Sequence, residues 1–162
     1  MQNFSLLLLS LALSFSALSC TTATIEDIAG EEPENVGNGS SDDLQSENNM
    51  TINITVGGKV FKADIEASET GEAFVAKLPL TLDMSELNGN EKYCYGVSLP
   101  RADKYFGTID AGDLMLYSGN CIVLFYGLAG GYSYTRIGKL QSVDGLSASL
   151  GRGSATVTFS KE

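Results

Sequence analysis

The stretch DLMLYSGNCIVLFYG, residues 113 to 127, carries the clearest fold information in this chain. Two short apolar runs, 114–117 and 121–126, flank Ser118-Gly119-Asn120, which is a typical turn sequence. Short buried runs on either side of a tight turn predict a hairpin of two strands. Soon after it, YSYTRIGKL (132–140) has the length and composition of a further strand.

The same short-strand pattern extends in both directions from this hairpin. Ile52, Ile54 and Val56 alternate with polar residues, and Gly57-Gly58 turns the chain into a second strand at 61–65. Further strands are expected at 80–84, from 93 onward and at 154–160. Only two segments, 68–79 and 143–151, have the caps and apolar spacing of short helices. The sequence therefore predicts a mainly β fold, a closed antiparallel barrel with two short helices.

Charge and composition exclude several classes of function. The 162 residues contain 20 acidic and 10 basic side chains, and eight of the acids lie at 21–50, where there is no basic residue. An acidic chain without a basic stripe is a poor nucleic-acid binder, since phosphate neutralisation dominates that affinity. The chain has no histidine, which removes Ser-His-Asp catalysis and histidine metal sites. We expect no metal and no cofactor.

The first 19 residues predict export. Phe4 to Leu18 is an apolar run of the length of a signal-peptide core and too short for a spanning helix. Ala17-Leu18-Ser19-Cys20 resembles a bacterial lipobox, in which Cys20 is lipidated and anchors the protein to a membrane. Two alternatives stay open: ordinary signal-peptidase cleavage, and retention of the segment as an uncleaved anchor. We expect a cell-envelope lipoprotein, with the outer membrane preferred.

Residues 20–49 are acidic, polar and rich in Gly and Ser. Such a composition buries too little apolar surface to offset the entropy of ordering, so a disordered tether is predicted. A flexible coil of this length reaches about 30 Å on average. The predicted organisation is a signal peptide at 1–19, a tether at 20–49 and a barrel domain at 50–162.

The order of several motifs resembles a known family. These motifs are ITVGGKVFKADIE (54–66), LPLTLDM (78–84), LNGNEKY (87–93), GTIDAGDLMLY (107–117), CIVLFY (121–126) and SYTRIGKL (133–140). They resemble the small bacterial and archaeal cyclophilin-like domains. The resemblance implies an eight-stranded antiparallel barrel with helices closing its two ends. True cyclophilins isomerise X–Pro bonds with an arginine in a Phe-His-Arg segment and an apolar pocket. This chain lacks that segment, along with any histidine or tryptophan.

Arg136 is the candidate for a replacement site. It lies on the same face of its strand as Tyr132 and Tyr134, and one donor in a desolvated pocket can stabilise a twisted amide. The candidate ligand-binding residues are Arg136, Tyr134, Tyr117, Phe125, Glu91 and Tyr93. A structural arginine, stacked on aromatic rings and paired with a carboxylate such as Glu91, is the favoured alternative to catalysis. Glu91 and Lys92 lie near a turn, where a solvated surface pair is expected.

The sequence leaves three functions open, of which one is a passive structural lipoprotein. The first is a module that binds a peptide, a protein or a small ligand. The second is a divergent prolyl isomerase that assists folding in the envelope, an interpretation that rests on fold analogy. Cys94 and Cys121 could form a disulfide in an exported protein, but the sequence does not fix the register of their strands.

Overall fold

The computed structural model describes residues 50–162, which form nine strands and two helices. The strands are β1 (Met50–Val56), β2 (Lys59–Ile65), β3 (Leu80–Leu87), β4 (Glu91–Tyr95), β5 (Lys104–Phe106), β6 (Asp113–Tyr117), β7 (Cys121–Phe125), β8 (Tyr132–Leu140) and β9 (Ala155–Lys161). The helices are α1 (Glu69–Val75) and α2 (Leu146–Leu150).

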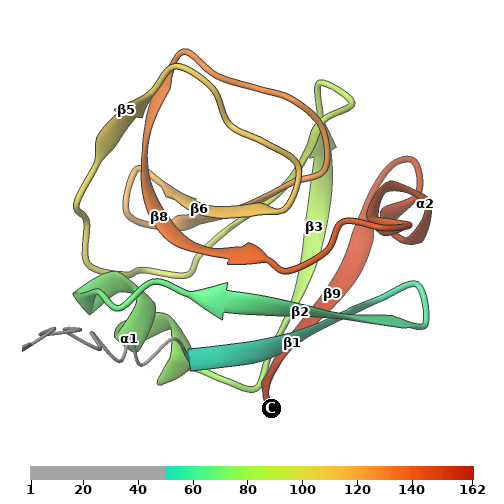
Figure 1. The fold of residues 1–162 in the computed structure, drawn as a ribbon, viewed down its shortest axis with the longest axis horizontal. Helices are drawn as coiled ribbons and strands as arrows, with labels where there is room; N and C mark the ends of the chain where they lie inside the picture. The colour runs from blue at the N-terminus through green and yellow to red at the C-terminus, as the bar shows by residue number, and fades with distance from the viewer. Residues whose placement is uncertain (1–49) are drawn as a thin grey trace, which may run out of the picture. The chain divides into compact units, whose positions relative to one another are not determined.

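Eight of these strands close into an antiparallel barrel. Their order is β2-β1-β9-β3-β4-β7-β6-β8, and pairing of β8 with β2 completes the ring. Figure 1 shows β8 bending along the wall between the β5 edge and β2. The predicted fold class, a closed antiparallel barrel with two short helices, is confirmed.

The ninth strand was not predicted. β5 lies in the segment 96–107, for which the sequence pattern predicts no regular structure, and it pairs with the first half of β8 outside the ring. Its three residues have no apolar alternation to reveal them. β5 exists because β8 is longer than its barrel partners, so its first residues have an open edge available for pairing.

The barrel wall carries two hydrophobic clusters, one on each of its faces. Alternation along β6 and β7 sends Leu114, Leu116, Ile122 and Leu124 into the main core inside the barrel. The intervening side chains point outward into a second cluster, which consists of Ile109, Met115, Cys121, Val123, Phe125 and Tyr134. Both faces of this hairpin are buried, which is why its sequence is almost continuously apolar.

The two helices lie at opposite ends of the β1–β2 hairpin in Figure 1. Ser68 caps α1 by accepting a hydrogen bond from the Gly71 amide at 3.1 Å. Phe74 of α1 is fully buried and meets Phe159 edge-on at 5.4 Å between ring centroids. In α2, Leu146 and Leu150 are buried in the same core. Each helix therefore closes the core through its apolar side chains.

A charged side chain is also enclosed by this barrel. Lys92 pairs with Leu124 across β4 and β7, so its side chain projects to the inner face, and it is fully buried. Its ammonium donates hydrogen bonds to Glu86 and to the carbonyl oxygens of Gly151 and Gly153, the latter two at 3.1 Å and 2.5 Å. Lys92 thereby connects β3 and β4 to the segment that follows α2.

The predictions for the signal peptide, the lipidated Cys20 and the tether lie outside the described residues. Within residues 50–162, neither helix has the length and hydrophobicity needed to cross a membrane.

Candidate functional site

A pocket of about 390 Å³ opens on the outer face of the barrel wall. Strands β4, β6, β7 and β8 supply its floor, and the loops that contain Ile109 and Ala129 supply its rim. Its lining residues are Leu87, Asn88, Asn90, Glu91, Tyr93, Tyr95, Ile109, Tyr117, Cys121, Val123, Ala129, Gly130, Tyr132 and Tyr134. The volume falls in the range of small-molecule sites.

Five of the lining residues are tyrosines, and strand alternation places them together. Tyr93 and Tyr95 are two apart on β4, and Tyr132 and Tyr134 are two apart on β8, so each pair shares one face of its strand. Tyr117 ends β6, and its ring lies 5.5 Å from that of Tyr134. We call these five residues the tyrosine cluster.

Two loops hold the rim of the pocket together. Ile109 and Ala129 exchange backbone hydrogen bonds at 2.8 Å and 2.9 Å, which form a single antiparallel bridge between the segments before β6 and after β7. Gly130 permits this close approach, because a Cβ at that position would lie only 2.1 Å from the carbonyl oxygen of Gly107. The rim is therefore fixed by backbone contacts and does not depend on side chains alone.

Glu91 lies against the floor of this pocket and is only 7% exposed. Within residues 50–162 its carboxyl has no hydrogen-bond or ion-pair partner, and its oxygens are not among the fully buried unpaired atoms, so they remain accessible from the pocket. Burial, and then the negative charge of Glu86, raise the pKa of Glu91 above its ordinary value.

The predicted solvated pair of Glu91 and Lys92 is therefore wrong. Both side chains are buried, and because they are consecutive on a strand they project to opposite faces of the barrel wall. Lys92 binds Glu86 at the barrel end, and Glu91 faces the outer pocket. The turn before β4 suggested that Glu91 and Lys92 are exposed. The loop after β7, however, packs against the start of β4, where the amides of Tyr126 and Gly127 both donate to the carbonyl of Asn90.

Tyr134 connects the pocket to the second cluster. Its ring meets Phe125 edge-on at 5.6 Å, and its exposure is 7%. Burial, followed by the charge of Glu91, raises the pKa of the Tyr134 phenol to about 12. Phe125 is fully buried behind Tyr134 and does not line the pocket. Among the candidates, Tyr134, Tyr117, Glu91 and Tyr93 are thus brought together, with Phe125 as their support.

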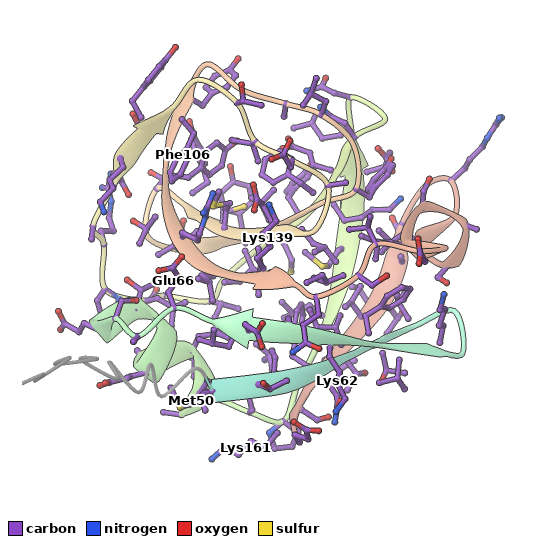
Figure 2. All side chains as sticks on the ribbon, viewed as in Figure 1. Met50, Lys62, Glu66, Phe106, Lys139 and Lys161 are labelled. Atoms are coloured by element: carbon purple, nitrogen blue, oxygen red, sulfur yellow. The ribbon has the colours of Figure 1, made fainter. Side chains whose placement is uncertain are left out.

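Arg136 lies outside this pocket. It projects to the outer face like Tyr134, but its Nη2 is 3.6 Å from Oδ2 of the buried Asp113, and its guanidinium lies 5.1 Å from the centre of the Phe106 ring. Phe106 on β5 and Lys139 on β8 are labelled in Figure 2. Lys139 is also 3.4 Å from Asp113. The carboxylate partner of Arg136 is therefore Asp113, and the suggested partner Glu91 is on the other side of the second cluster.

The two described cysteines are free thiols. Register pairs Tyr95 with Cys121 and Cys94 with Ile122. Cys94 packs against the inner core, whereas Cys121 belongs to the outer cluster, so the two sulfurs lie on opposite faces of the wall. Burial, followed by the charge of Cys94, raises the pKa of Cys121 to about 11, which leaves it a poor nucleophile.

Sequence reasoning missed several pocket residues. Tyr95 and Tyr132 were detectable, because each lies two positions from a predicted site tyrosine on the same strand. Asn90, Ile109 and Ala129 come from loops whose mutual contact follows only from barrel closure. Among the described residues, no cluster of three or more potential metal ligands occurs.

Comparison with known proteins agrees with this architecture. Residues 54–160 match the Cyclophilin-like family, so this chain belongs to that family. The fold is also similar to that of McbB, solved in complex with tryptophan (TM-score 0.54, 14% identity), over 68% of this chain. The chain spans only 44% of the length of McbB.

A second structure with this fold is the solution structure of the hypothetical protein AF2241 from Archaeoglobus fulgidus. It has a TM-score of 0.53 and 19% identity, and the match covers 70% of this chain and 95% of that one. Comparison with curated proteins finds no match. The structural likenesses concern the fold alone, so the function has to be argued from the pocket.

Proposed function

We propose that this protein is a lipid-anchored ligand-binding protein of the cell envelope. Cys20 would carry the lipid, residues 21–49 would hold the barrel off the membrane, and the outer pocket would bind a small organic ligand or the side chain of a peptide. The lipobox-like sequence supports the anchor. The pocket supports binding, since it combines a preformed rim, five aromatic rings and the polar groups of Asn90 and Glu91.

The observation that carries the binding proposal is the pocket's exposed aromatic surface. Tyr95, Tyr117 and Tyr132 are 58%, 40% and 62% exposed although neighbouring outward side chains are buried. Adjacent large rings left open to solvent are typical of a recognition surface. A passive structural barrel would have no comparable reason to gather five tyrosines at one opening.

The prolyl isomerase alternative has weaker support. Its candidate donor, Arg136, is engaged by Asp113 and Phe106 and does not line the tyrosine pocket. No arginine or lysine lines that pocket within the described part of the chain. Isomerisation in that pocket would require a different donor aimed at the twisted amide.

Binding is tested on the polypeptide 21–162, which lacks the predicted signal segment and Cys20. Amide chemical shifts are followed by NMR during titration with X–Pro peptides and with small aromatic compounds, including tryptophan, which McbB binds. We expect shifts at Tyr93, Val123 and Gly130, and their loss in Tyr95→Ala/Tyr132→Ala. Tyr105→Ala is the matched control, because Tyr105 is 70% exposed and lies outside the pocket. Shifts that survive in the double variant would contradict the proposal.

The same samples decide the alternative. Accelerated cis–trans exchange of an X–Pro peptide that is lost in Arg136→Ala would favour the isomerase and place its site at Arg136. The anchor is tested separately by metabolic labelling of the full chain with radioactive palmitate in a bacterial host. We expect Cys20→Ser to abolish the label and Cys94→Ser to retain it. A label that persists in Cys20→Ser would refute the lipoprotein assignment.

A further inference from the structure

The outer pocket contains hydrogen-bond acceptors without donors. The Glu91 carboxyl faces the pocket and has no hydrogen-bond or ion-pair partner within residues 50–162. The adjacent Asn90 donates through Nδ2 to the Leu128 carbonyl at 3.0 Å, and its side-chain oxygen is buried without a partner. The buried Asn90 oxygen carries a free-energy cost while it stays unpaired, and the Glu91 oxygens are accessible from the pocket. Both groups are therefore suited to a ligand that brings N–H donors.

The charge around Glu91 favours a cationic ligand. The pocket has no lysine or arginine among its described lining residues, and Glu86 lies close enough for its negative charge to act on Glu91. A desolvated carboxylate without a counter-ion gains most from a positive group. The neighbouring Lys92 does not neutralise the charge of Glu91, because its side chain projects to the inner face and binds Glu86.

The tyrosine cluster provides the second element of cation recognition. The faces of aromatic rings attract ammonium and guanidinium groups, and walls built from several rings are used to bind alkylammonium ions. Here, Tyr93 and Tyr95 are nearly perpendicular at 5.9 Å between centroids, and Tyr117 and Tyr134 are tilted at 5.5 Å. Rings set at different angles present faces on more than one side of a bound group.

We propose that the outer pocket selects small organic ammonium ions. The Glu91 carboxylate is the counter-ion, and the Asn90 side-chain oxygen is a further acceptor. The tyrosine cluster forms the wall around the apolar or aromatic body of the ligand. This inference rests on the proposed function and specifies its ligand class. The competing arrangement is a neutral ligand that accepts a hydrogen bond from the protonated Glu91 carboxyl.

The direction of the pH dependence separates these two arrangements. An ammonium ion binds the ionised carboxylate, so its affinity rises as the pH increases through the raised pKa of Glu91 and then levels off. A neutral acceptor binds the protonated acid, and its affinity falls over the same range. The groups that share the electrostatics of Glu91 are Glu86, Cys121 and Tyr134. The pKa values of Cys121 and Tyr134 are about 11 and about 12, and that of Glu86 is lowered.

The test uses three probes that share a phenyl body: 2-phenylethylammonium, 2-phenylethanol and 3-phenylpropionate. Each is titrated into the polypeptide 21–162 and followed by amide shifts between about pH 4.5 and pH 8, a range that spans acid titration above the ordinary glutamate pKa. We expect the ammonium to bind about tenfold more tightly than the alcohol at the upper pH, a difference of about 1.4 kcal/mol, and the carboxylate to bind weakest.

Variants assign the preference to Glu91. Glu91→Gln keeps the shape of the side chain, and we expect it to reduce the ammonium affinity to that of the alcohol and to remove the pH dependence. Glu72→Gln, an exposed carboxylate of α1 outside the pocket, is the matched control and should leave all affinities unchanged.

Each outcome decides a different claim. Equal affinities for the ammonium and the alcohol, or an affinity that falls with rising pH, would overturn the cation proposal and leave a binding pocket. Absence of pocket shifts with all three probes would overturn the cation proposal. If the peptide and aromatic panel also gave no shifts, the proposed function would fall with it. If Glu91→Gln changes the amide spectrum as a whole, Tyr93→Leu provides a second test, with the same expected loss of the preference for ammonium.

Discussion

Replacing Glu86 by Gln is predicted to destabilise the barrel more than replacing its partner Lys92 by Met. The Lys92 side chain is completely buried, whereas that of Glu86 is 25% exposed. In Glu86→Gln the buried ammonium loses its counter-ion but keeps the carbonyls of Gly151 and Gly153 and the Tyr126 ring at 5.4 Å. In Lys92→Met the buried charge itself is removed, and the remaining Glu86 can be hydrated.

The magnitudes follow from this asymmetry. Leaving an uncompensated buried charge costs about 3–5 kcal/mol, and the remaining contacts of Lys92 place Glu86→Gln near the lower limit, at about 3 kcal/mol. Lys92→Met loses the hydrogen bonds to two carbonyls but also the desolvation penalty of the ammonium, so we expect a cost of about 1–2 kcal/mol. The double variant should resemble Lys92→Met alone, which gives a coupling of about 3 kcal/mol between the two sites.

Urea unfolding of the four proteins measures these free energies, with equal m-values as the criterion for comparison. Glu162→Gln is the control, since the Lys62–Glu162 pair is about half exposed on both sides and should contribute less than about 1 kcal/mol. A smaller loss in Glu86→Gln than in Lys92→Met, or additive single effects, would refute the reasoning.

The same pair makes an acid-dependent contribution to stability. Burial tends to raise the pKa of Glu86, but hydrogen bonds from Lys92 and Tyr126 and the charge of Lys92 outweigh it, so the pKa lies below the ordinary value. A carboxyl whose pKa is lowered by folding stabilises the folded state above its unfolded pKa. This contribution should therefore be lost as the pH falls below about 4, and the pH dependence should be weaker in Glu86→Gln.

Three further predictions concern other parts of the barrel. Arg136→Ala should lower the free energy of unfolding by about 1–2 kcal/mol, because Asp113 loses a partner, and it should leave ligand shifts in the tyrosine pocket unchanged; a loss of those shifts would assign Arg136 to the site. Gly71→Ala should lower the free energy of unfolding by more than about 2 kcal/mol, because the new Cβ would lie 2.2 Å from the Glu66 carbonyl oxygen. Alanine usually favours a helix, so this contact reverses the usual effect. An unchanged urea midpoint would contradict it. Cys121 should react with iodoacetamide only after unfolding, since its thiol is buried and its pKa is about 11; rapid alkylation of the folded protein, followed by mass spectrometry, would show otherwise.

Local patterns in the sequence were enough to predict both helices and every strand except β5. Alternation at 52–56 and the continuous apolar runs at 114–117 and 121–126 predicted strands correctly. They did so because the polarity of each strand residue reflects whether its side chain is buried. The capping residue Ser68 and the apolar positions after it predicted α1 in the same way. Of the five tyrosines at the pocket, Tyr93, Tyr117 and Tyr134 were among the predicted site residues.

Tertiary structure decided what the individual polar groups do. Polarity suggested that Glu91 and Lys92 are solvated, but closure of the barrel buries both and sends them to opposite faces. The partner of Arg136 depended on which strand lies beside β8, and pairing with β6 placed Asp113 within reach. The pocket itself requires the contact between the segments around Ile109 and Ala129. Such contacts join residues far apart in sequence, so no local pattern records them, and only the closed ring of strands brings them together.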